Sequence, residues 1–276
     1  MIYIVPKDSI RKHVVPFLSK PKRGPNSRTR LENIVLAILY KLKTGCQWAM
    51  LPVKSFFTRQ PLAWQTVYYH FRKWIKDGSW KRAFVQIVAI NRSQLNLSLA
   101  HFDGTHSSAA KGAKQVGYHR KSKRKTSNTL WLVDNNGLVV SYIDPFAGNR
   151  NDLYEIESHF EKLVADLKRK GINPDGLFIN ADAGFDALPL RHMCERFGIH
   201  LNAPFQKRRN LKVVDNYDWH FDEEMYKERY CVERTNAWMD AYRSLRTRFD
   251  TTVESWQAWH DLYGVLSWYK RIQNPK

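Results

Sequence analysis

Hydrophobic residues recur at helical spacing in the first part of the chain. Apolar residues at positions 31, 34, 35, 38, 39 and 42 follow the i, i+3, i+4, i+7 pattern of an amphipathic helix, and Thr44-Gly45 marks its end. A second helix is predicted over residues 64–76, and its apolar stripe consists of Trp64, Val67, Phe71, Trp74 and Ile75. We therefore expect a small all-helical domain over residues 1–91.

From about residue 92 the pattern changes to short strands. Leucines at positions 95, 97 and 99 alternate with polar residues and predict a strand that ends at Asp103. Asn135-Asn136-Gly137 separates two apolar runs and predicts a hairpin over residues 128–143. Helices are predicted over 153–170, 188–197, 226–249 and 253–271, and short buried strands over 176–180 and 199–203. This order predicts an α/β domain over residues 92–276, a ribonuclease H-like mixed sheet with flanking helices.

The charge of the chain points to its partner. The formal net charge is +19, and residues 1–90 contain 17 Lys and Arg against three Asp and Glu. So basic a balance favours a polyanion, since Lys and Arg placed on phosphates release condensed counterions. The alternatives are a solvated basic surface, a ribosomal protein or a membrane-surface protein. The chain starts without the apolar stretch of a secretory signal, and its three cysteines are scattered without a C-x-x-C pair, so we expect a cytoplasmic protein.

The predicted helix over 64–76 has a polar and basic outer face, which suits a helix-turn-helix reader lying in a DNA groove. The alternative is a packing unit with solvated lysines. This face and the basic arm before it supply the candidate DNA contacts Arg28, Arg30, Thr66, Tyr69, His70, Arg72 and Lys73. A glycine-bearing segment after the first strand is expected to be a flexible loop that clamps phosphates, or else a solvated loop; its candidates are Lys111, Lys114, Arg120, Lys121, Lys123, Arg124 and Lys125. Lys207, Arg208 and Arg209 follow the last strand and are candidates of the same kind.

Three acidic residues stand out by position. Asp103 and Asp182 each end a predicted strand, so their carboxylates emerge at the same edge if the strands are parallel neighbours. Glu233 lies on a late helix and shares one face with Arg229, Asn236 and Asp240. Converging carboxylates repel one another unless cations lie between them, and carboxylate oxygens are the ligands that Mg²⁺ prefers. Taken singly, each acid is more often a turn, cap or surface residue; Asp186 is interpreted as such a cap, and the aromatic residues Trp256, Trp259, Trp268 and Tyr269 as core.

Several segments resemble a known family. The string HFDGTH around Asp103 resembles the first-aspartate motif of bacterial insertion-sequence DDE transposases, and NADAGFD around Asp182 resembles their second motif. The string YCVERTNAW around Glu233 is similar to their glutamate helix. In the N-terminal part, LYKLKTGCQW and WQTVY look like the helical domain of insertion-sequence family 5. The resemblance runs from about residue 20 to residue 250, and its motifs are specific only in combination.

The resemblance implies a DDE transposase that binds the terminal inverted repeats of an insertion sequence and catalyses DNA cleavage and strand transfer. Asp103, Asp182 and Glu233 would be both the catalytic and the metal-binding residues, holding two Mg²⁺ ions that Mn²⁺ can replace. A metal-bound water and then the freed 3′-hydroxyl would attack phosphates, without a covalent enzyme intermediate. Because two ends are joined, a homodimer assembled on double-stranded DNA is expected.

The chain departs from the family at one position. A Tyr-x2-Arg-x3-Glu-x6-Lys signature is matched by Tyr226, Arg229 and Glu233, but Asp240 stands where the lysine is common. Arg243, one turn further on, is therefore the candidate cation for the transposon end. Arg229 and Arg234 are further candidates for DNA contact near the acids. Two alternatives stay open: a structure-specific ribonuclease H-like nuclease that cuts without rejoining, and a domesticated DNA-binding protein without catalysis.

Overall fold

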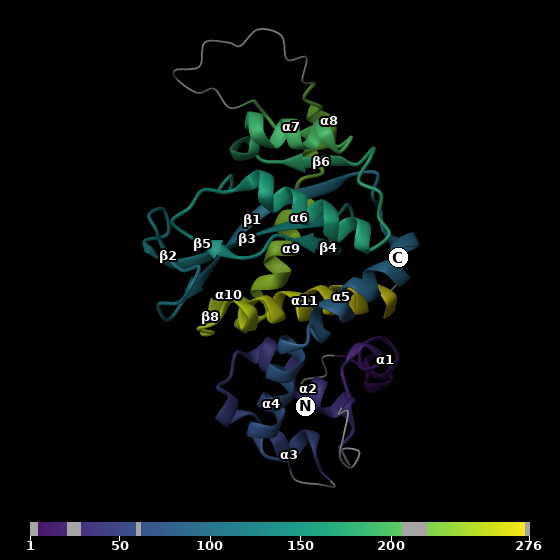
Figure 1. Ribbon diagram of the computed structural model, residues 1–276, viewed down its shortest axis with the longest axis vertical. Helices are drawn as coiled ribbons and strands as arrows, with labels where there is room; N and C mark the ends of the chain where they lie inside the picture. The colour runs from purple at the N-terminus through teal and green to yellow at the C-terminus, as the bar shows by residue number, and fades with distance from the viewer. Residues whose placement is uncertain (1–4, 21–28, 59–61, 206–219, 274–276) are drawn as a thin grey trace.

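The computed structural model describes residues 5–20, 29–58, 62–205 and 220–273. Figure 1 shows a group of helices at one end and a mixed sheet with its own helices at the other, with α5 (Ser79–Ile90) and α11 (Val253–Gln273) lying between them. The N-terminal helices are α1 (Lys7–His13), α2 (Leu31–Thr44), α3 (Val53–Phe56), α4 (Trp64–Lys76) and α5 (Ser79–Ile90). The later helices are α6 (Ile156–Arg169), α7 (Leu188–Arg196), α8 (Glu223–Lys227), α9 (Tyr230–Asp240), α10 (Arg243–Arg246) and α11 (Val253–Gln273).

The helical periodicity of the first part is confirmed. Helix α2 buries the predicted apolar face, and it ends where Gly45 adopts φ +67°, a left-handed conformation that costs glycine little. Helix α4 has the predicted bounds and buries Val67, Phe71 and Trp74. The outer side of α4 is therefore the side left for solvent or a ligand. In the described part of the chain, no helix is long and apolar enough to cross a membrane.

The sheet is mixed and is centred on one strand. Its strands are β1 (Ala100–Ala109), β2 (Gly117–His119), β3 (Arg124–Asp134), β4 (Val139–Tyr142), β5 (Phe146–Ala147), β6 (Phe178–Ala181), β7 (His200–Asn202) and β8 (Thr247–Arg248). The order is β2-β3-β1-β6-β7, with β4 and β5 paired to β3 and β8 paired to β1. Strand β3 is antiparallel to β1, while β6 and β7 run parallel to it. This is the ribonuclease H-like arrangement, so the predicted fold class is confirmed.

The strand that carries Asp103 differs from its prediction. Residues 92–94 form a short 3-10 helix, and β1 begins only at Ala100. It then continues to Ala109, because its pairing with β3 extends from Ala100 to Ser108. Asp103 therefore lies inside a strand, and the prediction that it ends one is wrong. The segment expected to be an open loop forms β2 and a turn into β3, and α5 was not predicted at all.

The prediction of one long helix over residues 226–249 is also wrong. The chain forms α8, α9 and α10 there, and Tyr242 has an extended conformation (φ −102°, ψ 98°) between the last two. The break redirects the chain so that β8 pairs with the end of β1, Thr247 opposite Ser108. Glu233 consequently lies on a helix of 11 residues that crosses β1.

The two ends of the molecule share an aromatic core. Trp256, Trp259 and Trp268 of α11 are fully buried, as predicted. The ring of Phe71 on α4 stacks on Trp259 with centroids 4.3 Å apart, and Trp48 stacks on the same indole at 6.0 Å. Helix α5 packs along α11, and α10 packs on α2. A division near residue 91 stays a prediction, and the two parts it would separate are in direct contact.

Candidate active site

Two of the three predicted acids lie side by side on neighbouring strands. Strands β1 and β6 are parallel, with Phe102 opposite Ala181, so Asp103 and Asp182 each follow at the same level. Asp182 comes directly after β6, and its carboxylate accepts a hydrogen bond of 2.8 Å from the N–H of Gly184. The turn that begins at Asp182 therefore fixes the position of its side chain.

Helix α9 brings the third acid and two polar side chains to Asp103. The guanidinium of Arg229 contacts Asp103 Oδ1 with Nη2 and Glu233 Oε1 with Nη1, both at 3.1 Å. Asn236 Nδ2 donates to the other oxygen of Asp103 at 3.2 Å, and the Thr105 hydroxyl donates to Asn236 Oδ1 at 2.7 Å. Arg229 thus bridges Asp103 and Glu233. Asp103 is mostly enclosed, with 16% of its side chain exposed, whereas 66% of the Glu233 side chain is exposed.

The electrostatics agree with this grouping. Burial raises the pKa of Asp103 to about 6, and the charges of Asp182 and Asp152 act in the same direction, while Arg229 opposes them. Burial also raises the pKa of Tyr226, and the charges of Asp182, Asp103 and Glu233 add to this effect. The charges of all three candidate acids therefore act on the same phenol, which agrees with their lying around one region of the sheet.

A fourth carboxylate, that of Asp152, lies near the site and was not predicted from the sequence. Asp152 lies against the backbone of β1, since a Cβ built on Gly104 would come within 2.8 Å of Asp152 Oδ1. The buried Asn128 of β3 donates to that oxygen at 2.5 Å. Burial raises the pKa of Asp152, with a contribution from the charge of Asp182. No local motif indicates Asp152, because its position near the site depends on its contacts with Asn128 of β3 and Gly104 of β1.

The donor set suits a hard cation, although an arginine holds two of its members. Among the described residues, no group of three or more His, Cys, Asp or Glu side chains is arranged to bind a metal ion. The guanidinium of Arg229 instead supplies the positive charge between Asp103 and Glu233. The pKa of Asp103 stays at about 6 even with the Arg229 guanidinium in contact, so the ionised carboxylate is not fully compensated, and its oxygens beside those of Asp182 fit a divalent ion.

The predicted DNA-binding residues lie in several places. Arg30, Lys111, Lys114, Arg120, Lys121, Lys123, Arg124 and Lys125 are exposed, the last seven around β2 and its turns. Arg28, Lys207, Arg208 and Arg209 lie outside the described residues. On α4, Thr66, Tyr69, Arg72 and Lys73 are at least partly exposed.

Some of these side chains have protein contacts that the sequence did not reveal. His70 turns partly inward beside the ring of Trp74, with centroids 5.0 Å apart. Arg72 Nη1 donates to Ser255 Oγ at 3.0 Å. Arg234 lies between two rings of its own helix, Tyr230 at 5.5 Å and Trp238 at 5.2 Å.

Of two further predictions, the one for Arg243 stays a prediction and the one for Asp186 is wrong. Arg243 is exposed on α10, and its Cβ lies near Gly45 at the end of α2. Asp186 does not cap α7, whose N-cap is Ala187; its carboxylate instead forms an ion pair of 2.8 Å with Arg191.

Comparisons with known proteins agree with the motifs. Residues 97–267 match the family described as "Transposase DDE domain", and residues 9–84 match "Putative transposase of IS4/5 family". No curated protein matches the sequence. Similar solved structures include a piggyBac transposase synaptic complex with hairpin DNA (11% identity, 97% of this chain, 72% of that chain, TM-score 0.49) and the Mos1 strand transfer complex (12% identity, 92% and 79%, TM-score 0.36).

Proposed function

Because the chain belongs to the DDE transposases of the IS4/5 family, we propose that Asp103, Asp182 and Glu233 are its catalytic triad. The observation that carries the proposal is the placement of Asp103 beside Asp182 on parallel strands, with Glu233 tied to Asp103 through Arg229. The function is DNA strand cleavage at the ends of an insertion sequence, followed by strand transfer.

The metal is a divalent cation, and we propose two Mg²⁺ ions held by the triad, with Mn²⁺ as a substitute. Bound there, such ions supply an activated attacking oxygen and stabilise the leaving oxygen of a phosphodiester. Asp103 is mostly enclosed and close to Asp182, and its raised pKa shows that its charged form needs a nearby cation. Asn236 and Thr105 hold the orientation of that carboxylate through their linked hydrogen bonds.

Arg229 has a second proposed role. Its guanidinium is engaged by Asp103 and Glu233, and a divalent ion between those carboxylates would take over the charge that Arg229 now supplies. Arginine binds phosphate oxygens in a bidentate manner, so a released Arg229 is suited to hold the scissile strand.

The proposed partner is double-stranded DNA, bound by two copies of the chain. The exposed cations around β2 and on α4 would contact phosphates, with residues 1–91 binding the terminal repeat and residues 92–276 carrying out the chemistry. A homodimer is proposed because strand transfer joins two transposon ends in one reaction.

The decisive experiment measures Mg²⁺-dependent cleavage and strand transfer on a labelled duplex that carries the element's end. Wild type is compared with Asp103→Ala, Glu233→Ala and the matched control Asp240→Ala, an exposed acid on the same helix as Glu233. We expect joined products from wild type and control, and DNA binding without products from the two triad variants. Cut but unjoined products from wild type would favour a nuclease, and triad variants as active as wild type would show that the site is wrong.

A further inference from the structure

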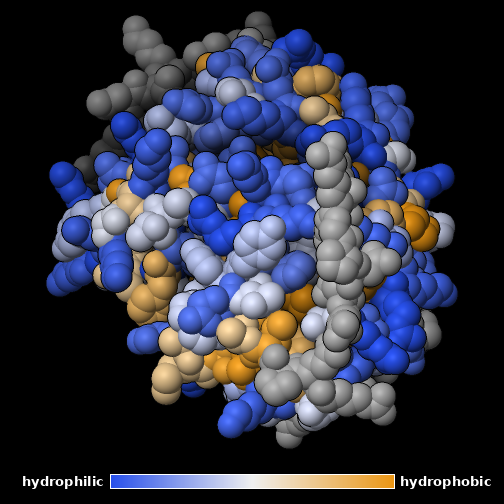
Figure 2. Space-filling view, turned by 60° about the horizontal axis from the view of Figure 1, so that its bottom comes forward, coloured by the Kyte–Doolittle hydropathy of each residue, from blue (hydrophilic) through white to orange (hydrophobic). Residues whose placement is uncertain are grey.

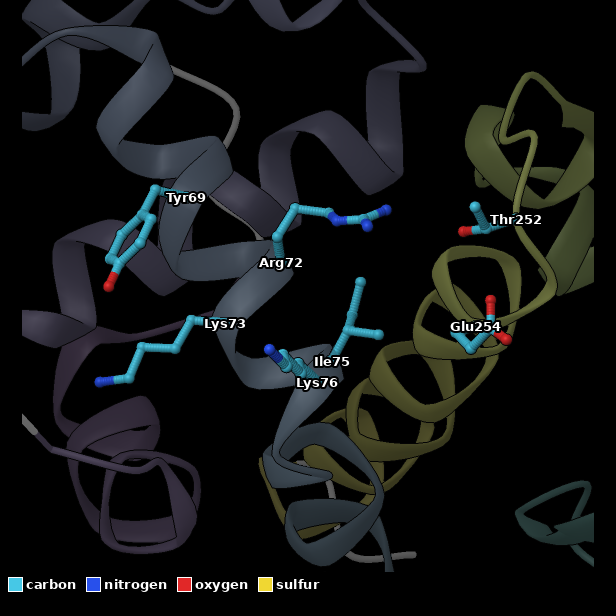
Figure 3. A pocket seen from close by; sticks show the side chains of 7 residues that line it. All are labelled: Tyr69, Arg72, Lys73, Ile75, Lys76, Thr252 and Glu254. Carbon is cyan, nitrogen blue, oxygen red and sulfur yellow. The ribbon is translucent and has the colours of Figure 1, made fainter.

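A pocket of about 530 Å³ lies between α4 and the first turn of α11, away from Asp103. Its lining consists of Tyr69, Arg72, Lys73, Ile75 and Lys76 from α4, with Thr252 and Glu254 opposite. Figure 3 shows Arg72 and Ile75 directed from α4 toward Thr252, with Tyr69 and Lys73 on the far rim. The pocket is thus formed jointly by the candidate DNA-reading helix and by the part of the chain that carries the proposed chemistry.

The charges of the pocket are not balanced. Three cations and one carboxylate line it, and none of the four forms an ion pair among the described residues. The polar ends of two cations contact neutral groups: Arg72 donates to the Ser255 hydroxyl at 3.0 Å, and Lys73 to the carbonyl of Ser19 at 3.4 Å. These hydrogen bonds fix the side chains without neutralising them.

The start of α11 adds to the positive potential. Thr252 Oγ1 accepts from the N–H of Ser255 at 3.3 Å, which caps a helix of 21 residues, and the positive end of the helix dipole faces this region. Glu254 lies in the first turn, where its charge is stabilised by that dipole. Its lack of an ion pair with Arg72 or Lys76 leaves both cations available to an incoming anion.

The walls between the charges are apolar. Tyr69 is 63% exposed, and Ile75 lies six positions further along α4. The face of the molecule drawn in Figure 2 is mainly hydrophilic and carries some hydrophobic patches. A cationic rim around apolar walls matches the sugar-phosphate strand of DNA, which presents anionic oxygens beside apolar sugar carbons.

We propose that this pocket binds backbone phosphates of the transposon-end duplex, so that α4 and α11 grip the same DNA strand. The inference rests on the proposed function and extends it, because it adds the start of α11 to the DNA contact proposed for α4. It also assigns Arg72 to the backbone: its guanidinium is tied to Ser255 at the junction instead of standing free to read bases.

The test measures the affinity for a labelled duplex by fluorescence anisotropy between 50 and 200 mM salt. The variants are Lys76→Ala, Glu254→Gln and the matched control Lys162→Ala, an exposed lysine on α6. Loss of one phosphate contact lowers the slope of log K against log salt by about 0.9, so the advantage of wild type over Lys76→Ala should shrink about 3.5-fold across this range. Glu254→Gln should bind more tightly than wild type at 50 mM salt, and Lys162→Ala should match wild type.

The same effects are expected on the element's end and on a scrambled duplex, because phosphates carry no sequence information. Lys76→Ala with the wild-type slope, or Glu254→Gln with wild-type affinity, would overturn the proposal, as would effects confined to one duplex. The two hypotheses separate cleanly. A wild-type protein without Mg²⁺-dependent products refutes the proposed function, whereas an active wild type with an unaltered Lys76→Ala slope refutes only the pocket.

Discussion

Asp103→Asn is predicted to stabilise the protein in the absence of metal. The pKa of Asp103 is raised from 3.8 to about 6, so the folded state binds its proton more tightly than the unfolded state does. For a carboxyl with a raised pKa, folding stability falls as the pH rises from about 4 to about 6 and is lowest above that. At about 1.4 kcal/mol per pKa unit, the charged form costs about 3 kcal/mol at pH 8.

An asparagine removes that cost while keeping the size of the side chain. The pKa of about 6 already includes the attraction of Arg229, and Arg229 keeps its ion pair with Glu233 in the variant, so the expected gain is at most about 3 kcal/mol. The gain should be present at pH 8 and should vanish below about pH 3, where the wild-type carboxyl is protonated in both the folded and the unfolded state.

The assay is urea unfolding of wild type and variant in EDTA at several pH values, followed by circular dichroism. Asp77→Asn provides a control of opposite sign: although burial raises its pKa, hydrogen bonds from Ser19 and Ser79 outweigh burial and lower the pKa of Asp77. That control should be destabilised at pH 8 and approach wild type in acid. An Asp103→Asn protein that is less stable than wild type at pH 8 would refute the reasoning.

Three further predictions concern other parts of the fold. Gly264→Ala should lower the free energy of unfolding by about 1–3 kcal/mol in urea titrations, because the new Cβ would lie 2.4 Å from the ring of Phe84. Burial lowers the pKa of His260 to about 4, so folding stability is lost as the pH falls from 6.5 toward 4. His260→Gln should reduce this loss of stability in thermal melts compared at pH 7 and pH 5. A variant with the same loss as wild type would contradict this prediction. Asp152→Ala should cost about 1–3 kcal/mol by leaving the buried amide of Asn128 without its acceptor, and should lower the cleavage rate; equal stability and rate would show that Asp152 has neither role.

The sequence predicted the helices best where a single face is apolar. Helix α4 appears with its predicted bounds, and α2 ends at the predicted Gly45, because periodicity and a left-handed glycine are local properties. The length of β1 was not predictable in this way. It continues past Asp103 because β3 pairs with it, and the ends of a ladder are set by the partner strand.

The candidate site also combines features that local sequence predicts with features that depend on distant residues. The two aspartates could be placed on neighbouring strands from motifs and element order, since each lies in a short recognisable string and Asp182 directly follows a strand. The contacts of Asp103 with Arg229 and Asn236 join residues 126 and 133 positions apart, and no local pattern encodes them. The nearness of Asp152 depends on the close approach that Gly104 permits, which becomes visible only in three dimensions.

The stack of Phe71 on Trp259 has a consequence for where the DNA is cut. It holds α4 against α11 through buried rings, so a repeat bound by α4, as proposed, would lie at a set distance and rotation from the carboxylates. In a transposase built in this way, cleavage depends on the number of helical turns of DNA between the repeat and the scissile phosphate. Inserting about 5 base pairs between repeat and cleavage point turns the scissile phosphate to the opposite side of the duplex, and about 10 restores its direction, at a repeat of 10–10.5 base pairs per turn. The distance along the DNA between the bound repeat and the cleaved phosphate would thus depend on an aromatic contact in the protein interior.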